Sequence, residues 1–156
     1  MGLDMYLSKK TYIGANYEHR NVKAKITIKI GDDLIKINPK RISSIEESVG
    51  YWRKANHIHK WFVDNVQNGE DDCKEYYVSK EQLEKLLADC ELVLKAKKRK
   101  EMEIVEETLP TQRGFFFGGS EYDEYYFISI KDTIKIIKDI LKEDLTNADI
   151  YYHSSW

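Results

Sequence analysis

Residues 109–127 read Leu-Pro-Thr-Gln-Arg-Gly-Phe-Phe-Phe-Gly-Gly-Ser-Glu-Tyr-Asp-Glu-Tyr-Tyr-Phe, which gathers aromatic rings around glycines and a single arginine. Loops normally avoid such rings, because contiguous exposed apolar surface promotes association. Two interpretations follow. The segment forms a hairpin whose Phe115 and Phe117 face the core around a Gly-Gly-Ser turn, or the rings line a pocket that a ligand fills. Both can hold together.

The segments toward the N-terminus carry the pattern of strands. Leu3, Met5 and Leu7 alternate with polar or amphipathic neighbours, which predicts a strand with one buried face. Residues 22–37 predict a hairpin, because apolar side chains alternate with lysines and a threonine up to Ile30 and Gly31-Asp32-Asp33 turns the chain. The lysines on its outer face would discourage edge-to-edge pairing.

A helix is predicted next, beginning at a capping-box spacing of Ser43 and Glu46 and ending at Asn68-Gly69. A short strand over 75–78 precedes a second helix, which Ser79 and Gln82 cap. Both helices are predicted from three- and four-residue apolar spacing. The stripe of the first is Ile42, Ile45, Val49, Trp52, Asn56, His59, Val63 and Val66, and that of the second is Leu83, Leu86, Leu87, Cys90, Val93 and Leu94.

The C-terminal half adds one more helix and a last strand. Residues 95–100 are basic and 101–107 acidic, which predicts a solvated helix end followed by a charged linker or edge strand. A third helix is expected from Ser129 to about Glu143, and residues 149–156 read as a strand. The order predicts one α+β domain over residues 1–156, with about three helices against a mainly antiparallel sheet.

Composition limits the classes of function. With 42% hydrophobic and 33% charged residues, the chain has the balance of a globular protein, and its formal net charge of −2 favours neither nucleic acid nor a membrane as partner. No signal peptide and no long apolar run is apparent. Together with the two cysteines in unrelated contexts, this predicts a cytoplasmic protein with free thiols.

His57 and His59 lie two positions apart on the first predicted helix. Their side chains would point about 200° apart, so they cannot chelate one ion together. We expect His59 on the buried stripe beside Asn56 and hydrogen-bonded, and His57 on the polar face with Arg53, Lys60 and Asp64. Two inward polar groups one turn apart, Asn56 and His59, both need partners, which makes them candidates for a site.

An acidic loop offers the alternative function. Asp64, Asp71 and Asp72 supply oxygen atoms of the kind that hard cations bind, and His57 would be the base of a metal-dependent hydrolase or nuclease acting on a phosphate ester. The spacing matches no known metal-binding loop, so we assign no metal ligand. No P-loop, dinucleotide fingerprint or nucleophile elbow is present either, and we assign no catalytic residue and no cofactor.

The aromatic segment supports a ligand pocket. Glycines let a backbone approach a ligand and offer N–H groups to anions, arginine provides a fork for phosphate, and tyrosine or phenylalanine stacks on a base. Arg113 is the one cation between Glu101 and Lys131. The candidate ligand-binding residues are Arg113, Gly114, Phe116, Tyr122, Tyr125, Asn56, His59 and Trp52.

Several segments together resemble a family of short bacteriophage and prophage proteins whose motifs name no known chemistry. The resemblance rests on segments spread over nearly the whole chain: Gly2-Leu-Asp-Met-Tyr-Leu7, His59-Lys-Trp-Phe-Val63, Asp71-Asp-Cys73, Tyr76-Tyr-Val-Ser79, Leu109-Pro-Thr111, Gly114-Phe-Phe-Phe-Gly118, Tyr122-Asp-Glu-Tyr125 and Ser154-Ser-Trp156. It implies an intracellular phage accessory protein, a class in which inhibitors of host defence are frequent.

These observations lead us to expect a non-catalytic binding protein, an anti-defence factor in the host cytoplasm. It would sequester a nucleotide-like small ligand or bind a host defence protein. We expect no membrane partner and no nucleic acid, and a homo-oligomer is left open.

Overall fold

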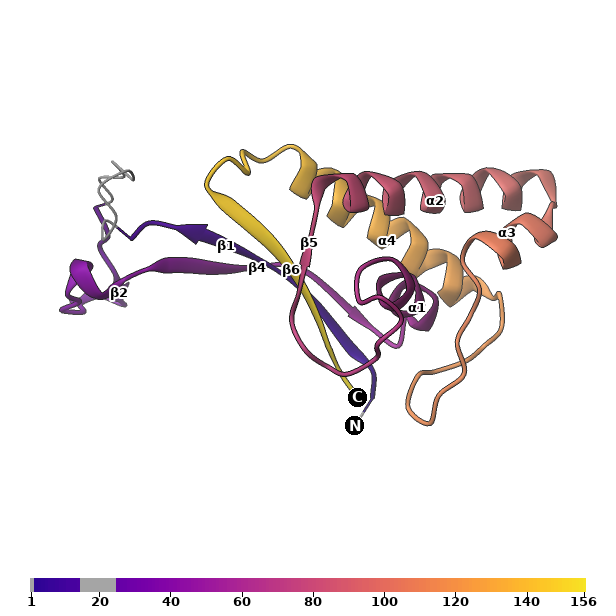
Figure 1. Cartoon of the computed structure of the whole chain (residues 1–156), viewed down its shortest axis with the longest axis horizontal. Helices are drawn as coiled ribbons and strands as arrows, with labels where there is room; N and C mark the ends of the chain where they lie inside the picture. Colours follow the sequence, from indigo (N-terminus) through magenta and orange to yellow (C-terminus); the bar gives the residue numbers. More distant parts are fainter. Residues whose placement is uncertain (1, 15–24) are drawn as a thin grey trace.

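The computed structural model describes residues 2–14 and 25–156, and it confirms an α+β domain built on a mainly antiparallel sheet. The described residues contain four α-helices, one short 3₁₀ helix, a four-stranded sheet and a separate two-stranded sheet (Figure 1). The elements are β1 (Asp4–Tyr12), β2 (Lys29–Ile30), β3 (Asp33–Leu34), η1 (Pro39–Arg41), β4 (Ser44–Arg53), α1 (Asn56–Asn65), β5 (Tyr76–Val78), α2 (Lys80–Arg99), α3 (Met102–Thr108), α4 (Glu124–Leu141) and β6 (Ala148–Ser155).

The main sheet has the order β4-β1-β6-β5, and every neighbouring pair is antiparallel. The predicted strands near both ends of the chain are confirmed as β1 and β6, and they lie side by side at the centre of the sheet. Met5 and Leu7 of β1 and Tyr152 of β6 are fully buried, whereas Asp4 and Tyr6, which alternate with Met5 and Leu7, are not. The sheet therefore has one face in the core, against the helices, and one face turned away from them.

The first predicted helix is wrong over its N-terminal half, because residues 44–53 form strand β4. A register shift explains the error. Leu7 pairs with Gly50 and Ser8 pairs with Ser48, so Val49 is an extra residue that breaks the two-residue period. Because of the extra residue, the apolar side chains Ile45, Val49 and Trp52 are four and three positions apart in the sequence, which is also the spacing of one face of a helix. Strand pairing with β1 outweighs that local signal.

Helix α1 is confirmed only for the second half of the prediction, and α2 is confirmed with its cap. The side-chain oxygen of Ser79 accepts the backbone N–H of Gln82, and the Gln82 side chain accepts the backbone N–H of Ser79. This is a complete capping box. The buried residues of α2 are Leu83, Leu86, Cys90, Val93 and Ala96, close to the predicted stripe.

Two further expectations are wrong. The acidic part of the charged segment is helix α3 and not a linker or edge strand, because Val105 and the following Leu109 are buried in the core. The aromatic segment contains no hairpin: α4 begins at Glu124, capped by the Asp123 side chain, and takes up Tyr126 and Phe127. Phe117 is buried as expected, but Phe115 is 94% exposed.

Residues 25–41, which we call the arm, contain the two-stranded sheet β2-β3 and η1. The predicted turn is present, with Gly31 at a φ of +60°, while the predicted residues Val22 and Ala24 lie outside the described residues. Figure 1 shows the arm at one end of the molecule, away from the helices. No side chain of the arm belongs to the hydrophobic core.

Candidate functional site: a cavity beside the start of helix α1

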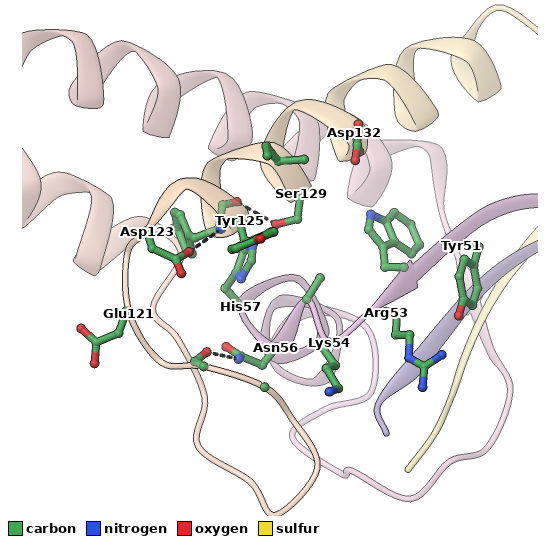
Figure 2. Close-up of a pocket in the computed structure, with 16 residues that line it drawn as sticks. Tyr51, Arg53, Lys54, Asn56, His57, Glu121, Asp123, Tyr125, Ser129 and Asp132 are labelled. Atoms are coloured by element: carbon green, nitrogen blue, oxygen red, sulfur yellow. Dashed lines mark hydrogen bonds between the residues drawn. The ribbon is translucent and has the colours of Figure 1, made fainter. Parts of the chain in front are cut away.

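A cavity of about 650 Å³ lies between two walls that are distant in sequence. One wall is the junction of β4 and α1, and the other runs from the glycines of the aromatic segment into the first turns of α4 (Figure 2). Its lining residues are Tyr51, Trp52, Arg53, Lys54, Ala55, Asn56, His57, Gly118, Gly119, Glu121, Asp123, Tyr125, Tyr126, Ile128, Ser129 and Asp132.

The β4–α1 junction makes a sharp turn that brings two cations to the cavity. Lys54 has a φ of +57°, in the left-handed region that ends a strand abruptly. Gly118 packs against this turn with a φ of +89°, and a Cβ there would lie 3.0 Å from the Cβ of Lys54. Arg53 and Lys54 therefore stand beside the first turn of α1, where the Ile58 N–H already donates to the Ala55 carbonyl oxygen and the N–H groups of Asn56 and His57 precede the helical hydrogen bonds.

Asn56 fixes the aromatic segment against α1. Its Nδ2 donates to the carbonyl oxygens of Phe117 (3.1 Å) and Gly119 (2.8 Å), and its Oδ1 accepts the backbone N–H of Gln112 (2.9 Å). The side chain is 1% exposed, as the sequence predicted for an inward polar group. Through these bonds Asn56 positions the second wall of the cavity. The prediction that this inward-facing amide needs hydrogen-bond partners is confirmed.

His57 faces α4, and the expectation that it lies on the polar face is wrong. The residue is 4% exposed, its ring lies 4.1 Å from that of Tyr126, and its Nε2 is 2.8 Å from the Ser129 hydroxyl oxygen. Burial lowers the pKa of His57 to about 3, so the ring is neutral at physiological pH. The site therefore contains a neutral imidazole paired with a serine.

The Ser129 hydroxyl has one proton and two neighbours. Its oxygen is 2.7 Å from the carbonyl oxygen of Tyr126, which can only accept. When Ser129 donates to that carbonyl, His57 must donate through Nε2 and cannot act as a base toward the serine. Within the described residues, His57 Nδ1 has no carboxylate partner to orient the ring, unlike the histidine of a serine–histidine–aspartate triad.

His59 is buried on the other side of α1, as predicted. Its Nδ1 is 2.7 Å from the Tyr152 hydroxyl, and its Nε2 is 3.0 Å from the Asp71 carboxylate, which also accepts the indole N–H of Trp156. The Tyr152 ring stacks on Phe62 at 3.9 Å. This network ties the loop before β5 to the C-terminal strand. His59 does not line the cavity.

The predicted ligand-binding residues divide into two groups. Trp52, Asn56 and Tyr125 line the cavity, and Tyr125 is 81% exposed. The others lie outside it. Arg113 and Gly114 are exposed, and Tyr122 packs on Tyr126 and accepts the backbone N–H of Thr111. The Phe116 carbonyl accepts the backbone N–H of Leu3. Arg113 is thus exposed and does not line this cavity.

Sequence reasoning missed the charged lining of the cavity. Arg53 and Lys54 stand on the β4–α1 side, with Glu121 and Asp123 opposite them and Asp132 on α4 (Figure 2). One signal was available: Tyr51 to Asn56 crowds aromatic, cationic and amide side chains within six residues. Because this stretch was wrongly predicted to be helical, these side chains were expected on different faces of a helix and not beside one another.

The acidic residues of the alternative hydrolase site do not converge. Asp64 pairs with Lys60, Asp72 pairs with Lys74, and Asp71 is bonded to His59 and Trp156. Across residues 2–14 and 25–156, no group of three or more histidine, cysteine, aspartate or glutamate side chains is arranged to hold a metal ion. The specific residues on which that alternative depended therefore form no common site.

Of the helices in the described part of the chain, none combines the length and apolar character that crossing a membrane requires. No protein-family model matches the chain, and neither the curated proteins nor the solved structures contain a match.

Proposed function

We propose that the protein binds a nucleotide-like ligand in the cavity beside α1 and holds it without converting it. The observation that supports this most directly is the pairing of opposite chemistries on facing walls. Arg53, Lys54 and the start of α1 favour an anionic group, while Glu121 and Asp132 accept hydrogen bonds from hydroxyl or amino groups. A nucleotide carries both kinds of group.

Size and aromatic lining agree with a ligand of this class. A volume of about 650 Å³ falls within the usual range for small-molecule sites. Tyr51 is 50% exposed and Tyr125 is 81% exposed, and both line the cavity, so their rings are available to stack on a base. The phosphate would lie toward Lys54 and the base toward Tyr125.

Retention without conversion is favoured by the state of the one serine–histidine pair in the cavity. Ser129 is engaged by the Tyr126 carbonyl, and His57 lacks an orienting carboxylate among the described residues. A fluorophosphonate probe tests this directly. We expect no covalent adduct at Ser129. If the probe does label Ser129, and His57→Gln abolishes the labelling, the protein would be a hydrolase with a serine nucleophile and not a binding protein.

Calorimetric titration with nucleoside mono-, di- and triphosphates and cyclic dinucleotides tests the binding, with the unphosphorylated nucleosides as controls. We expect at least one phosphorylated compound to bind and to be recovered intact after heat denaturation. Lys54→Gln and Arg53→Gln should each weaken binding by about ten- to a hundredfold, because each removes a charge-assisted contact worth about 1.5–3 kcal/mol.

Arg113→Gln is the matched control for Arg53→Gln. Both remove an exposed arginine charge, but Arg113 does not line the cavity. We expect this variant to bind like the wild type. Loss of binding in Arg113→Gln, with full binding in Arg53→Gln, would move the site to the aromatic segment.

A protein ligand is the second candidate, and one observation favours it. Phe115 is 94% exposed and its ring lies edge-on to that of Phe116, with centroids 4.8 Å apart, and exposed aromatic side chains are common anchors for a protein partner. Phe115→Ser should leave stability and nucleotide binding unchanged. Should that variant alone abolish activity in cells, protein binding would become the better interpretation.

The resemblance to phage proteins suggests the cellular setting, which we propose to be inhibition of a host defence system. Phage infection of hosts that carry single defence systems, with and without this protein expressed, provides the assay. We expect protection of the phage in at least one host. Lys54→Gln should abolish that protection if a signalling nucleotide is the target.

A further inference from the structure

The face of the main sheet turned away from the helices carries a row of aromatic side chains. Strand register places Tyr51, Tyr6 and His153 side by side across β4, β1 and β6. Ring centroids are 5.4 Å apart for Tyr51 and Tyr6 and 4.7 Å apart for Tyr6 and His153, which are stacked. Tyr77 and Tyr151 continue this surface on β5 and β6, 6.1 Å apart. We call these five residues the tyrosine face.

The tyrosine face is accessible and incompletely satisfied. Tyr51 is 50% exposed and Tyr77 is 55% exposed, and none of the five residues belongs to the hydrophobic core. By strand alternation Ser8 shares the side of Tyr6. Ser8 is 5% exposed, and both its hydroxyl oxygen and His153 Nδ1 are buried without a hydrogen-bond partner among the described residues. Buried polar atoms normally have partners.

The charges on the tyrosine face indicate which class of partner it can bind. Four acidic side chains and two basic ones lie on it by strand alternation and register, a formal net charge of −2: Asp4, Glu46, Glu75, Asp149, Lys10 and Arg53. Such a surface repels the phosphate backbone of a nucleic acid. It suits a basic protein segment that also brings apolar side chains, since tyrosines at interfaces contact both aliphatic and cationic groups.

The arm of the same chain has the complementary character. Its five cations, Lys25, Lys29, Lys36, Lys40 and Arg41, exceed its two anions, Asp32 and Asp33, for a formal net charge of +3. Its aliphatic side chains are open to solvent: Ile30 is 69% exposed and Leu34 is 65% exposed. Two-stranded hairpins with no covering surface are marginal in water, so a surface that covers this one would stabilise it.

Within one chain the arm leaves the tyrosine face uncovered, since both remain exposed. We infer that two copies of this chain associate, with the arm of one copy lying on the tyrosine face of the other. An exchange of this kind is isologous and closes as a two-fold dimer, because each copy contributes one arm and one face. Tyr51 and Arg53 belong both to this surface and to the lining of the cavity, so association is tested by molecular mass and not by ligand binding.

Light scattering on a sizing column tests the association. We expect the 18.4 kDa chain to elute as a dimer at about 100 µM. An arm variant, Lys29→Glu with Lys36→Glu, and a face variant, Glu46→Lys with Asp149→Lys, should each dissociate at least tenfold more readily. None of these four residues belongs to the hydrophobic core, so an unchanged melting temperature serves as the test of folding.

The mixture of the two variants gives the decisive result. In a heterodimer, the acidic arm of one variant meets the basic face of the other, and the remaining contact is unaltered. The mixture should therefore form dimers when each variant alone is monomeric. A monomeric wild type, or a dimer that neither variant weakens, would overturn the inference. So would a monomer that binds single-stranded oligonucleotides through Lys29 and Lys36.

Discussion

His57 and His59 show how much one residue's environment depends on what surrounds its helix. Their predicted divergence is confirmed, because His57 meets Ser129 on α4 and His59 meets Tyr152 on β6. The predicted difference in exposure is wrong, since both are buried. Helix α1 is covered on both sides, and a short sequence window cannot reveal a second covering element.

His57→Ala should destabilise the protein by about 1–3 kcal/mol, because it removes a buried ring and leaves Ser129 with one partner fewer. Urea denaturation measures the change. Lys60→Ala on the same helix is the control, since its ion pair with Asp64 is exposed and should contribute less than about 1 kcal/mol. Equal effects of the two substitutions would contradict the burial of His57.

Acid should unfold the protein in part through His57. Its pKa is lowered from 6.5 to about 3, so between these values the unfolded chain binds a proton that the folded protein does not. Stability therefore rises with pH in this window, and it falls from about pH 6.5 downward by up to about 1.4 kcal/mol per pH unit.

Urea denaturation at pH 7.5 and pH 5 measures this effect in the wild type and in His57→Gln. The variant should lose about 2 kcal/mol less than the wild type between the two pH values, because glutamine does not titrate. Parallel losses in both proteins would show that His57 is not the responsible group.

At the scale of elements, the cavity depends on how the aromatic segment is attached to α1. Three hydrogen bonds from one side chain, Asn56, hold residues 112–119 in place. The segment has no regular secondary structure to stabilise it, so its position depends on these bonds, on the burial of Phe117 and on the bond from the Leu3 N–H to the Phe116 carbonyl.

Asn56→Ala should therefore release this segment. We expect faster hydrogen exchange over 112–119, the N–H of Gln112 included, together with weaker ligand binding. Asn65→Ala is the control, because Asn65 makes its hydrogen bond to Trp61 of its own helix. Unchanged protection in Asn56→Ala would mean that the core contacts of Phe117 suffice.

The start of α2 provides a second prediction at this scale. Ser79→Ala breaks the capping box and should cost about 1 kcal/mol. The effect extends beyond α2, because Gln82 also donates to the Asn65 carbonyl at the end of α1. Thermal unfolding measures the loss, with the exposed Lys80→Ala as control, and a loss below about 0.3 kcal/mol would contradict the assigned cap.

At the scale of the molecule, metal should have no part in stability. The carboxylates of the alternative metal site are engaged with different partners, Asp64 with Lys60 and Asp71 with His59. Dialysis against EDTA should leave the melting temperature unchanged, because no bound ion would be removed. A lower melting temperature after dialysis, reversed by adding manganese or calcium, would favour the metal-dependent alternative.

Local patterns in the sequence determined the elements whose signals are complete within a few residues. The alternation of Leu3, Met5 and Leu7 marked β1, the Ser79–Gln82 spacing began α2, and the glycine at position 31 turned the arm. Each depends on contacts between near neighbours, so propensity and spacing suffice to predict it.

Tertiary structure alone decided β4 and the cavity. Pairing with β1 over Ser44–Arg53 makes a strand of residues whose apolar spacing favours a helix, because a bulge at Val49 shifts the period. Only that strand brings Arg53 and Lys54 into the lining of one cavity with Asp123 and Asp132, which lie some seventy residues later in the chain. Long-range pairing energy and packing against α4 set this arrangement, and no local window of sequence contains either.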